Sequence, residues 1–437
     1  MSTKIKTIAT KEDGKATLTP KLRFPEFRDA EGWNETQLQK IARPVSDRAV
    51  TGDGDNVLSL SGEHGLVLQS DYFGKKVAGD SAERYLKLLR NDFVYNDRTT
   101  KASTFGTIKR LSKYSGGIVS PIYKCFRFHA DENPVFWEWY FESGSHDAAL
   151  GGLVNEGARA GRFNISITQF LSTTAWRPDA PEQQRIAECL SSVDELMAAQ
   201  ARKVDALKTH KNGLMQQLFP REGETQPRLR FPEFQNAGEW VEGQIADIGT
   251  VLQGYGFPER HQGLKSGDYP FYKVSDISKS LAAGKVFIEE SANYINESLL
   301  KELRAKPIPS GTTVFAKIGE AIRSNKRAIT TVPCLIDNNA AGVKRIKGKA
   351  TDAFVYLLME QISLIDHAGG VVPAVNKSAI EAIEIKYPAI EEQQKITGCL
   401  SSLEELVASE TQKLDALKTH KKGLMQQLFP SPEEVGV

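Results

Sequence analysis

Two stretches of the chain place apolar residues at a period of 3.5 over about five heptads. In residues 186–218, eight of the ten heptad positions a and d are apolar, and residues 396–428 give the same count. A period sustained over this length is typical of a coiled-coil seam. Pro220 and Pro430 end the pattern, because proline cannot continue a helix. The pattern predicts helices within 180–220 and 389–430, each a rod of about 55 Å.

The two helical stretches are copies of one another. Residues 182–220 and 392–430 are identical at 27 of 39 positions, at an offset of 210. The hexapeptide LRFPEF also occurs twice, at 22–27 and 229–234, and a tryptophan follows each time (Trp33 and Trp240). The regions between have little identity. The chain is therefore a tandem duplication, which indicates one task performed twice on different targets.

The variable middles lack a long helical period and predict short strands bounded by Gly, Asp and Asn. Short helices are expected around 134–142 and 352–362. The expected strands are NVLSL (56–60), DFVYN (92–96), GIVSPIYKCFRF (117–128), TTVFAKI (312–318) and RAITTV (327–332). We therefore predict an α+β fold with an N-terminal tail (1–18), a first variable domain (19–179), a first helix (180–220), a linker with the second variable domain (221–388), a second helix (389–430) and a C-terminal tail (431–437).

Duplicated halves are often related by a pseudo-two-fold axis. Under such an axis the two helices pair as an antiparallel coiled coil with one variable domain at each end. The alternative is that each helix packs only on its own domain. Near-identity of the two helices favours their pairing with each other.

Composition narrows the class of protein. The 437 residues are enough for two to four domains. No apolar run approaches the roughly 18 residues of a membrane span, and the N-terminus has no apolar signal region. The four cysteines form no CxxC pair, so we expect a reduced, cytoplasmic protein. The net charge of +1 by itself indicates no partner.

The distribution of charge is more informative. Residues 84–127 and 304–349 each hold ten Lys or Arg against two acidic residues, a local charge of +8 in both halves. Such clustering is typical of a surface that neutralises phosphates, although a solvated basic face is the alternative. Segments 96–110 and 317–327 add Asn, Ser and Thr, which reach phosphates and base edges. The expected DNA contacts are Arg98, Lys101, Ser103, Lys109, Arg110 and Lys113 in the first domain and Lys317, Arg323, Asn325, Lys326 and Arg327 in the second.

Motifs for catalysis are missing from the sequence. It has no P-loop, no GxGxxG after a strand, no GxSxG and no HExxH. NPVF at 133–136 is similar to the NPPF-type motif of DNA adenine methyltransferases, but it lacks the second proline, and no FxGxG precedes it. Pro134 is better explained as the first residue of a helix. We therefore assign no catalytic and no metal-binding residue.

Together these features resemble the specificity subunit of type I restriction–modification systems. The resemblance rests on LRFPEF followed by Trp, on the EQQ-I start of each helix and on its GLMQQLFP end. It implies two target-recognition domains that each read half of a bipartite DNA site, and a helix pair that fixes the gap. It also implies a subunit without chemistry of its own, bound to two modification subunits that use S-adenosylmethionine and to restriction subunits that use ATP and Mg.

Residues repeated off the helical seam indicate where such partners dock. A two-helix seam requires only positions a and d, yet other positions are identical in both copies. These are Ser191, Ser192, Lys208, Thr209, Gln216 and Gln217 in the first helix and Ser401, Ser402, Lys418, Thr419, Gln426 and Gln427 in the second. The alternatives are a DNA-binding regulator that acts alone and a coiled-coil scaffold without a role on nucleic acid.

Overall fold

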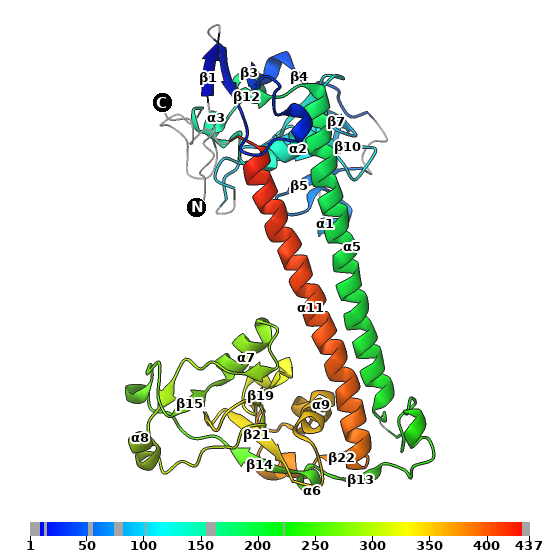
Figure 1. Ribbon diagram of the computed structural model, residues 1–437, viewed down its shortest axis with the longest axis vertical. Coiled ribbons are helices and arrows are strands. Elements are labelled where there is room, and N and C mark those ends of the chain that lie inside the picture. Colours follow the sequence, from blue (N-terminus) through cyan, green and yellow to red (C-terminus); the bar gives the residue numbers. More distant parts are fainter. Residues whose placement is uncertain are drawn as a thin grey trace. The chain divides into compact units, whose positions relative to one another are not determined.

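The computed structural model (Figure 1) divides into two compact units. It describes residues 9–12, 15–50, 56–73, 82–100, 103–153, 163–221 and 223–430. Unit 1 contains residues 1–200 and 413–437, and unit 2 contains residues 201–412. Each unit therefore holds one variable domain and a stretch of each long helix.

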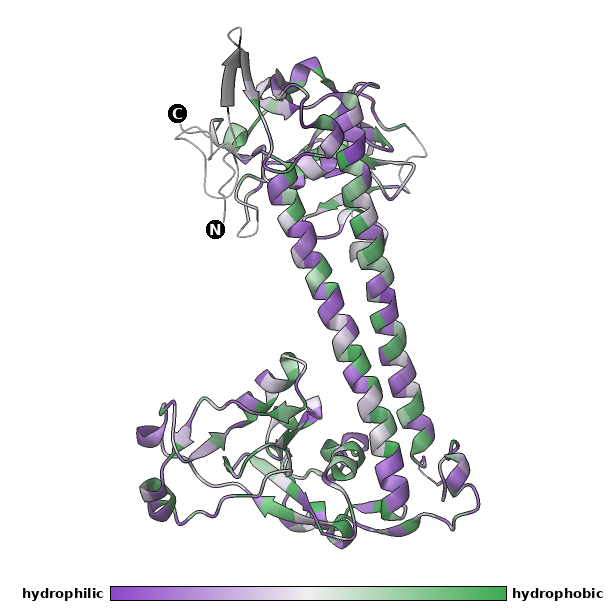
Figure 2. Ribbon diagram, in the orientation of Figure 1, coloured by the Kyte–Doolittle hydropathy of each residue, from purple (hydrophilic) through white to green (hydrophobic). Residues whose placement is uncertain are grey.

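The two long helices have the predicted extent. Helix α5 spans Ala180–Leu218 and helix α11 spans Ile390–Leu428 (Figure 1, green and orange to red). Every predicted a and d position on them is buried or half-buried, whereas most intervening positions are exposed. Figure 2 shows the resulting alternation of apolar and polar residues along both helices. The heptad pattern thus identified the buried stripe of each helix correctly.

Ion pairs connect the two helices within each unit. In unit 2, Lys211 pairs with Glu404, and the Lys203 ammonium lies 3.1 Å from the Glu410 carboxylate. In unit 1, the Lys421 ammonium lies 2.6 Å from the Asp194 carboxylate. Lys211 and Lys421 occupy the same heptad position in the two sequence copies.

The first variable domain is a mixture of small sheets and short helices. One sheet has the order β1-β2-β3-β12 and another the order β4-β11-β8-β9; smaller sheets pair β10 with β7 and β5 with β6. The helices are α1 (Gln69–Phe73), α2 (Pro134–Glu142), α3 (Asp147–Gly151) and α4 (Ile167–Ser172). The strands are β1 (Ala9–Glu12), β2 (Lys15–Leu18), β3 (Trp33–Gln37), β4 (Ala42–Pro44), β5 (Leu58–Ser61), β6 (Gly65–Leu68), β7 (Leu86–Leu89), β8 (Phe93–Asn96), β9 (Thr107–Arg110), β10 (Gly116–Val119), β11 (Lys124–Phe128) and β12 (Thr174–Arg177).

The second variable domain repeats the four-strand order of the first domain's main sheet, with β14-β21-β18-β19 in the places of β4-β11-β8-β9, and it differs in the added strand β16 and in its smaller sheets. Its main sheet runs β14-β21-β18-β19-β16, beside a sheet β17-β15-β20 and a pair β13-β22. The helices are α6 (Ile245–Ile248), α7 (Val274–Ala282), α8 (Glu297–Glu302), α9 (Asp352–Gln361) and α10 (Lys377–Glu381). The strands are β13 (Val241–Gln244), β14 (Gly249–Gln253), β15 (Tyr269–Tyr272), β16 (Phe287–Ile288), β17 (Tyr294–Ile295), β18 (Thr313–Ala316), β19 (Arg327–Thr330), β20 (Leu335–Ile336), β21 (Ala340–Arg345) and β22 (Glu384–Tyr387).

The predicted mixture of helix and strand is confirmed. Helices α2 and α9 lie where the apolar runs at 134–142 and 352–362 predicted them. Pro134 is the first residue of α2, and the Asn133 side chain caps the helix by accepting hydrogen bonds from the next turn. NPVF is therefore the start of a helix whose aromatic residues are buried. Strands β5, β8, β10, β11, β18 and β19 lie within the expected stretches or overlap them.

The hexapeptide LRFPEF fastens each variable domain to the start of a long helix. The Arg23 guanidinium donates to both carboxylate oxygens of Glu182, at 2.8 and 2.6 Å, and to two backbone carbonyls. In unit 2, the Arg230 guanidinium makes the same contacts with Glu392, at 2.8 and 2.7 Å, and with two carbonyls. Both ion pairs are buried.

The last residues of each long helix pack against the repeated tryptophans. The ring centroid of Phe429 lies 6.2 Å from that of Trp33 in unit 1, and the centroid of Phe219 lies 5.9 Å from that of Trp240 in unit 2. Each pair is edge-to-face, and each phenylalanine also contacts a ring of α2 or α9. The frame around each variable domain is therefore built from repeated residues.

Candidate nucleic-acid interface

A cleft in unit 1 gathers part of the predicted DNA-contacting set. It has a volume of about 530 Å³ and lies beside β8, β9 and the end of α2. Arg98, Ser103 and Lys109 are among its lining residues. Arg98 is exposed, and the half-buried hydroxyl of Ser103 donates to the carbonyl of Gly106. The cleft therefore presents cations and hydroxyl groups on one concave surface.

Lys109 and Arg110 are held by carboxylates of α2. The Lys109 ammonium lies 2.6 Å from Glu142, and the Arg110 guanidinium donates twice to one oxygen of Glu138, at 2.8 and 2.6 Å. Burial raises the pKa of Glu138 although Arg110 lies against it. These ion pairs connect β9 to α2, so both cations have a structural role.

The remaining cations predicted in unit 1 differ in their surroundings. Lys113 is exposed, with its ammonium 5.9 Å from the centroid of the Tyr114 ring. Lys101 lies outside the described residues. Arg98 and Lys113 are thus the predicted cations that the structure describes as exposed in this domain.

In unit 2 the predicted DNA contacts lie along one segment, from the end of β18 to the first residue of β19. Lys317 is half-buried and donates to Gln253, and burial lowers the pKa of its ammonium. Gly319, with a φ of 78°, turns the chain into a short 3₁₀ segment, Glu320–Ser324. Arg323 is 60% exposed and its guanidinium lies 3.0 Å from Glu320; Lys326 is also exposed. The loop therefore presents two exposed cations.

Asn325 and Arg327 shape this loop from within. Asn325 adopts a left-handed conformation, with a φ of 48°, and its side chain accepts a hydrogen bond from Arg327 at 2.6 Å. Arg327 is 2% exposed, and its guanidinium lies 5.0 Å from the centroid of Phe315. Burial lowers the pKa of Arg327 to about 10. Its side chain supports the loop from below, and it does not reach the surface.

Carboxylates from outside the two basic stretches reduce their charge. Glu138 and Glu142 neutralise cations of the first stretch. In the second, the Asp352 carboxylate lies 2.8 Å from Lys344 and 3.2 Å from Arg345. Counting charge along the sequence missed these partners, because α2 and α9 follow the basic stretches in the chain.

The repeated residues off the seam lie on the surface of the long helices. All of the proposed docking residues are exposed except Ser191, which is half-buried. The backbone carbonyls of Gln217 and Gln427 accept hydrogen bonds from Leu229 and Leu22, both at 3.0 Å. Their side chains remain exposed.

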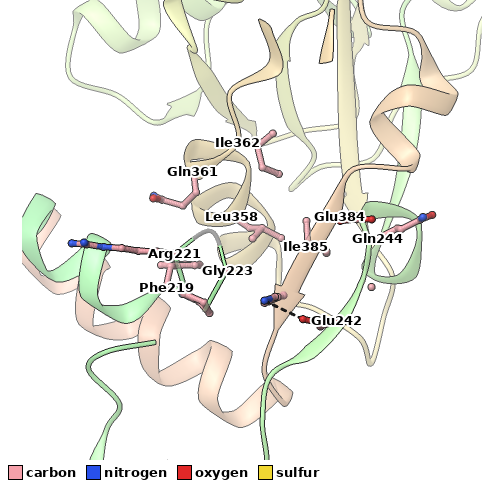
Figure 3. A pocket seen from close by; sticks show the side chains of 13 residues that line it. Phe219, Arg221, Gly223, Glu242, Gln244, Leu358, Gln361, Ile362, Glu384 and Ile385 are labelled. Atoms are coloured by element: carbon pink, nitrogen blue, oxygen red, sulfur yellow. Dashed lines mark ion pairs between the residues drawn. The ribbon is translucent and has the colours of Figure 1, made fainter. Parts of the chain in front are cut away.

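A pocket lies at the end of α5. Its volume is about 650 Å³, and it is bounded by Phe219, the end of α9 and the strand pair β13–β22 (Figure 3). An ion pair of 3.0 Å joins Lys386 and Glu242 in its wall. Among the described residues no cluster of three or more metal-ligating side chains occurs, here or elsewhere. The pocket therefore lies where the end of α5 meets α9 and the strand pair β13–β22.

Sequence reasoning missed the two Arg–Glu contacts that hold this frame. Arg23 and Arg230 belong to LRFPEF, and Glu182 and Glu392 open the repeated helices. A cation and an anion that are both repeated form a candidate pair, which is a signal that the sequence did contain.

No helix among the described residues combines the length and the apolar character that a membrane span requires.

Comparison with known proteins agrees with the fold. Residues 237–419 match the family described as the type I restriction modification DNA specificity domain. The resemblance to type I specificity subunits that the repeated motifs indicated is thereby confirmed.

Two relatives come from Methanocaldococcus jannaschii. The MjaVIII specificity subunit of a type I restriction enzyme is 36% identical over 205 residues, which cover 46% of this chain and 43% of the relative. The MjaIX specificity subunit is 23% identical over 267 residues, which cover 57% of this chain and 58% of the relative. The matches therefore span less than two thirds of the relatives' lengths.

Solved structures share the fold over most of the chain. A chain from a study of complex assembly and conformational transition of the type I R-M system aligns with a TM-score of 0.57 and 14% identity, covering 94% of this chain and 99% of that one. The S subunit of a type I restriction–modification system from M. genitalium aligns with a TM-score of 0.53 and 12% identity over the same shares. At these identities the likeness concerns the fold alone.

Proposed function

We propose that this chain is the non-catalytic, DNA-reading specificity subunit of a type I restriction–modification complex. Each variable domain reads one half of a bipartite, asymmetric DNA site. The observation that carries the proposal is the equal frame around unequal middles. Arg23–Glu182 and Arg230–Glu392 repeat the same contacts and the main sheets repeat one four-strand order, whereas the smaller sheets and the sequences of the two middles differ. Two different readers in one repeated frame fit a target with two different halves.

The long helices act as the spacer between the half-sites. In this proposal they form an antiparallel coiled coil with pseudo-two-fold symmetry. The ion pairs of unit 2 support the antiparallel direction, because Lys203 pairs with Glu410 while the later Lys211 pairs with the earlier Glu404. One added heptad lengthens such a rod by about 10 Å, or about three base pairs of DNA.

We rank the predicted DNA contacts by the exposure of their side chains. Arg98 and Lys113 in unit 1 and Arg323 and Lys326 in unit 2 are exposed cations, so they are the first candidates for phosphate and guanine contacts. Ser103, Lys317 and Asn325 are half-buried, and Lys109 and Arg110 are paired with carboxylates, so we rank them second. Arg327 is left out because its guanidinium is buried.

The partners are double-stranded DNA, two modification subunits and the restriction subunits. Two equal copies of a docking surface on the helices, such as Ser192 with Lys208 and Ser402 with Lys418, suit two equal modification subunits. S-adenosylmethionine, ATP and Mg belong to those partners in this proposal, and this chain binds no cofactor.

The first experiment is a genome-wide map of methylated adenine with and without this gene. We expect one split motif with a fixed gap to lose its methylation when the gene is deleted. Unchanged methylation, together with salt-dependent DNA binding by the purified chain, would favour the stand-alone regulator instead.

The spacer role has its own test. One heptad is inserted at corresponding points of α5 and α11, and the methylated motif is mapped again. The gap is expected to lengthen while both half-sites keep their bases. A variant that reads altered bases across an unaltered gap contradicts the spacer role.

A further inference from the structure

Unit 2 carries two adjacent valines at the surface. Val371 is 104% exposed and Val372 is 62% exposed. A single exposed apolar residue is ordinary in a folded protein, so exposure alone assigns no function. The conformation of the backbone around the two valines, and the residues beside them, indicate a function for the pair.

A tight loop holds the two valines outward. Gly369 and Ala374 exchange two backbone hydrogen bonds, both of 3.1 Å, which close the loop at its base. Gly370 has a φ of 89°, a conformation that strongly favours glycine, and Pro373 restricts the chain on the other side. The loop is therefore a shaped element, and its tip consists of Val371 and Val372.

The loop is tied to the segment with the predicted DNA contacts. The N–H of Gly319 donates to the carbonyl of Pro373 at 2.7 Å, and the N–H of Val375 donates to the carbonyl of Lys317 at 2.9 Å. These bonds fix the valine loop beside residues 317–327, which include the exposed Arg323 and Lys326. The apolar tip and the exposed cations are thus parts of one connected surface.

The charge of this surface suits a polyanion. The exposed charged residues of segment 317–327 are Arg323, Lys326 and Glu320, so cations exceed carboxylates on this surface. The valine loop itself, residues 369–375, contains no charged residue. Phosphates are attracted to the cations, whereas the apolar tip needs an apolar group to contact. In the major groove of DNA, the 5-methyl group of thymine supplies that group.

We propose that Val371 and Val372 read thymine in the second half-site through contact with its 5-methyl group. Lys326 holds a neighbouring phosphate and Arg323 contacts the DNA beside it, so that the tip lies in the major groove. This assignment rests on the proposed function, and it adds residues that determine specificity without any hydrogen bond to a base. It predicts a reader with a polar, charged rim and an apolar tip.

The test removes the apolar contact in two ways: from the DNA, by omitting the thymine methyl group, and from the protein, by shortening the valines. The full chain, in the complex in which it is purified, is titrated with the duplex of its mapped motif. A second duplex carries deoxyuridine in place of every thymine of the second half-site. We expect wild type to bind the deoxyuridine duplex about fourfold more weakly for each lost methyl contact.

The variant combines Val371→Ala with Val372→Ala, and it is expected to bind both duplexes equally. Val332→Ala is the matched control, because Val332 is an exposed valine of unit 2 outside both loops. The control should discriminate between the duplexes as wild type does.

The failures of the two proposals are distinguishable. If wild type prefers its motif over a scrambled duplex but binds the thymine and deoxyuridine duplexes equally, only the valine assignment is overturned. If wild type does not prefer its motif, both proposals are overturned. A double variant that keeps its DNA discrimination but loses a copurified subunit would show that the tip contacts protein instead.

Discussion

Arg23 holds Glu182 in unit 1 as Arg230 holds Glu392 in unit 2, yet the smaller sheets attached to these frames differ. The order β4-β11-β8-β9 of one domain recurs as β14-β21-β18-β19 in the other, where β16 is added. Beside this main sheet, one domain has the strand pairs β10-β7 and β5-β6, and the other has the sheet β17-β15-β20. The residues of each frame contact the long helices. Because the helices are copies of one another, the same contacts require the same residues in both units. The main sheet keeps its four-strand order in both units, whereas the smaller sheets and the surface side chains are free to differ.

The two domains also differ in how they hold their cations. In unit 1, Arg110 of β9 lies against Glu138 of α2, where it forms an ion pair. In unit 2, Arg327 opens β19 and is buried beside Phe315 and Asn325, without a carboxylate at ion-pair distance among the described residues. Similar local charge in the sequence therefore produces different surfaces.

Removal of the buried arginine–glutamate ion pair of one unit should have the largest effect on the comparison of the two units. Arg230→Ala leaves the buried Glu392 carboxylate without its cation, which typically costs about 3–5 kcal/mol. We expect amide hydrogen exchange to show lost protection in unit 2 while unit 1 is largely unchanged. Arg23→Ala should produce the reverse.

Arg228→Ala is the matched control for the frame contact. Its guanidinium pairs with the Glu224 carboxylate at the surface, so the variant should leave protection in both units unchanged. Equal loss of protection in both units after Arg230→Ala would contradict separate frames.

A buried histidine contributes acid sensitivity to unit 1. His146 is 1% exposed, lies 3.1 Å from the Thr173 hydroxyl, and burial lowers its pKa to about 3. Between pH 6.5 and 3 the unfolded state binds a proton that the native state does not, so stability falls as pH is lowered. The loss is about 2 kcal/mol on going from about pH 7 to about pH 5.

The check is hydrogen exchange of each unit at about pH 7 and about pH 5. None of the histidines that the structure describes in unit 2 is buried, so that unit should lack this contribution. In unit 1, His146→Gln should remove the pH-dependent part of the loss. An unchanged pH dependence in this variant would assign the acid sensitivity to other groups.

Arg323→Ala separates the two readers. Loss of a guanidinium contact to guanine should cost about 1–3 kcal/mol of discrimination at the second half-site and leave the first half-site unaffected. Methylation mapping of the variant measures both halves at once. Arg260→Ala is the control, because Arg260 is an exposed cation of unit 2 outside the basic stretch. Damage at the first half-site would contradict modular reading.

The smallest expected effect concerns a phosphate contact. Lys113→Ala should weaken binding to all sequences alike and reduce the slope of log affinity against log salt by about 1. Lys109 provides the comparison, since its ammonium already lies on Glu142. Lys109→Ala should change the slope less. Equal changes for both lysines would mean that pairing within the protein does not decide which cations meet DNA.

Much of the fold was predictable because its signals are local. The heptads identified the stripe of α5 and α11 that is buried, and the aromatic run after Pro134 identified α2. Strand order was not predictable, because β4 pairs with β11 across about eighty residues and no pattern in either strand specifies its neighbour. Of the candidate DNA contacts, the sequence identified the exposed Arg323 and also the buried Arg327, since residue type alone does not separate them.

The sequence by itself determined that the protein is a duplication with two long helices, two different middles and basic stretches in both. These features follow from periodicity, identity and composition, which act within a few turns of chain. Only the tertiary structure decided which cations remain exposed, which carboxylates neutralise the others, and that the loop with Val371 and Val372 is bonded to Lys317 and Gly319. Those outcomes depend on contacts such as Arg23 with Glu182, 159 residues apart, and such contacts exist only once the chain has folded.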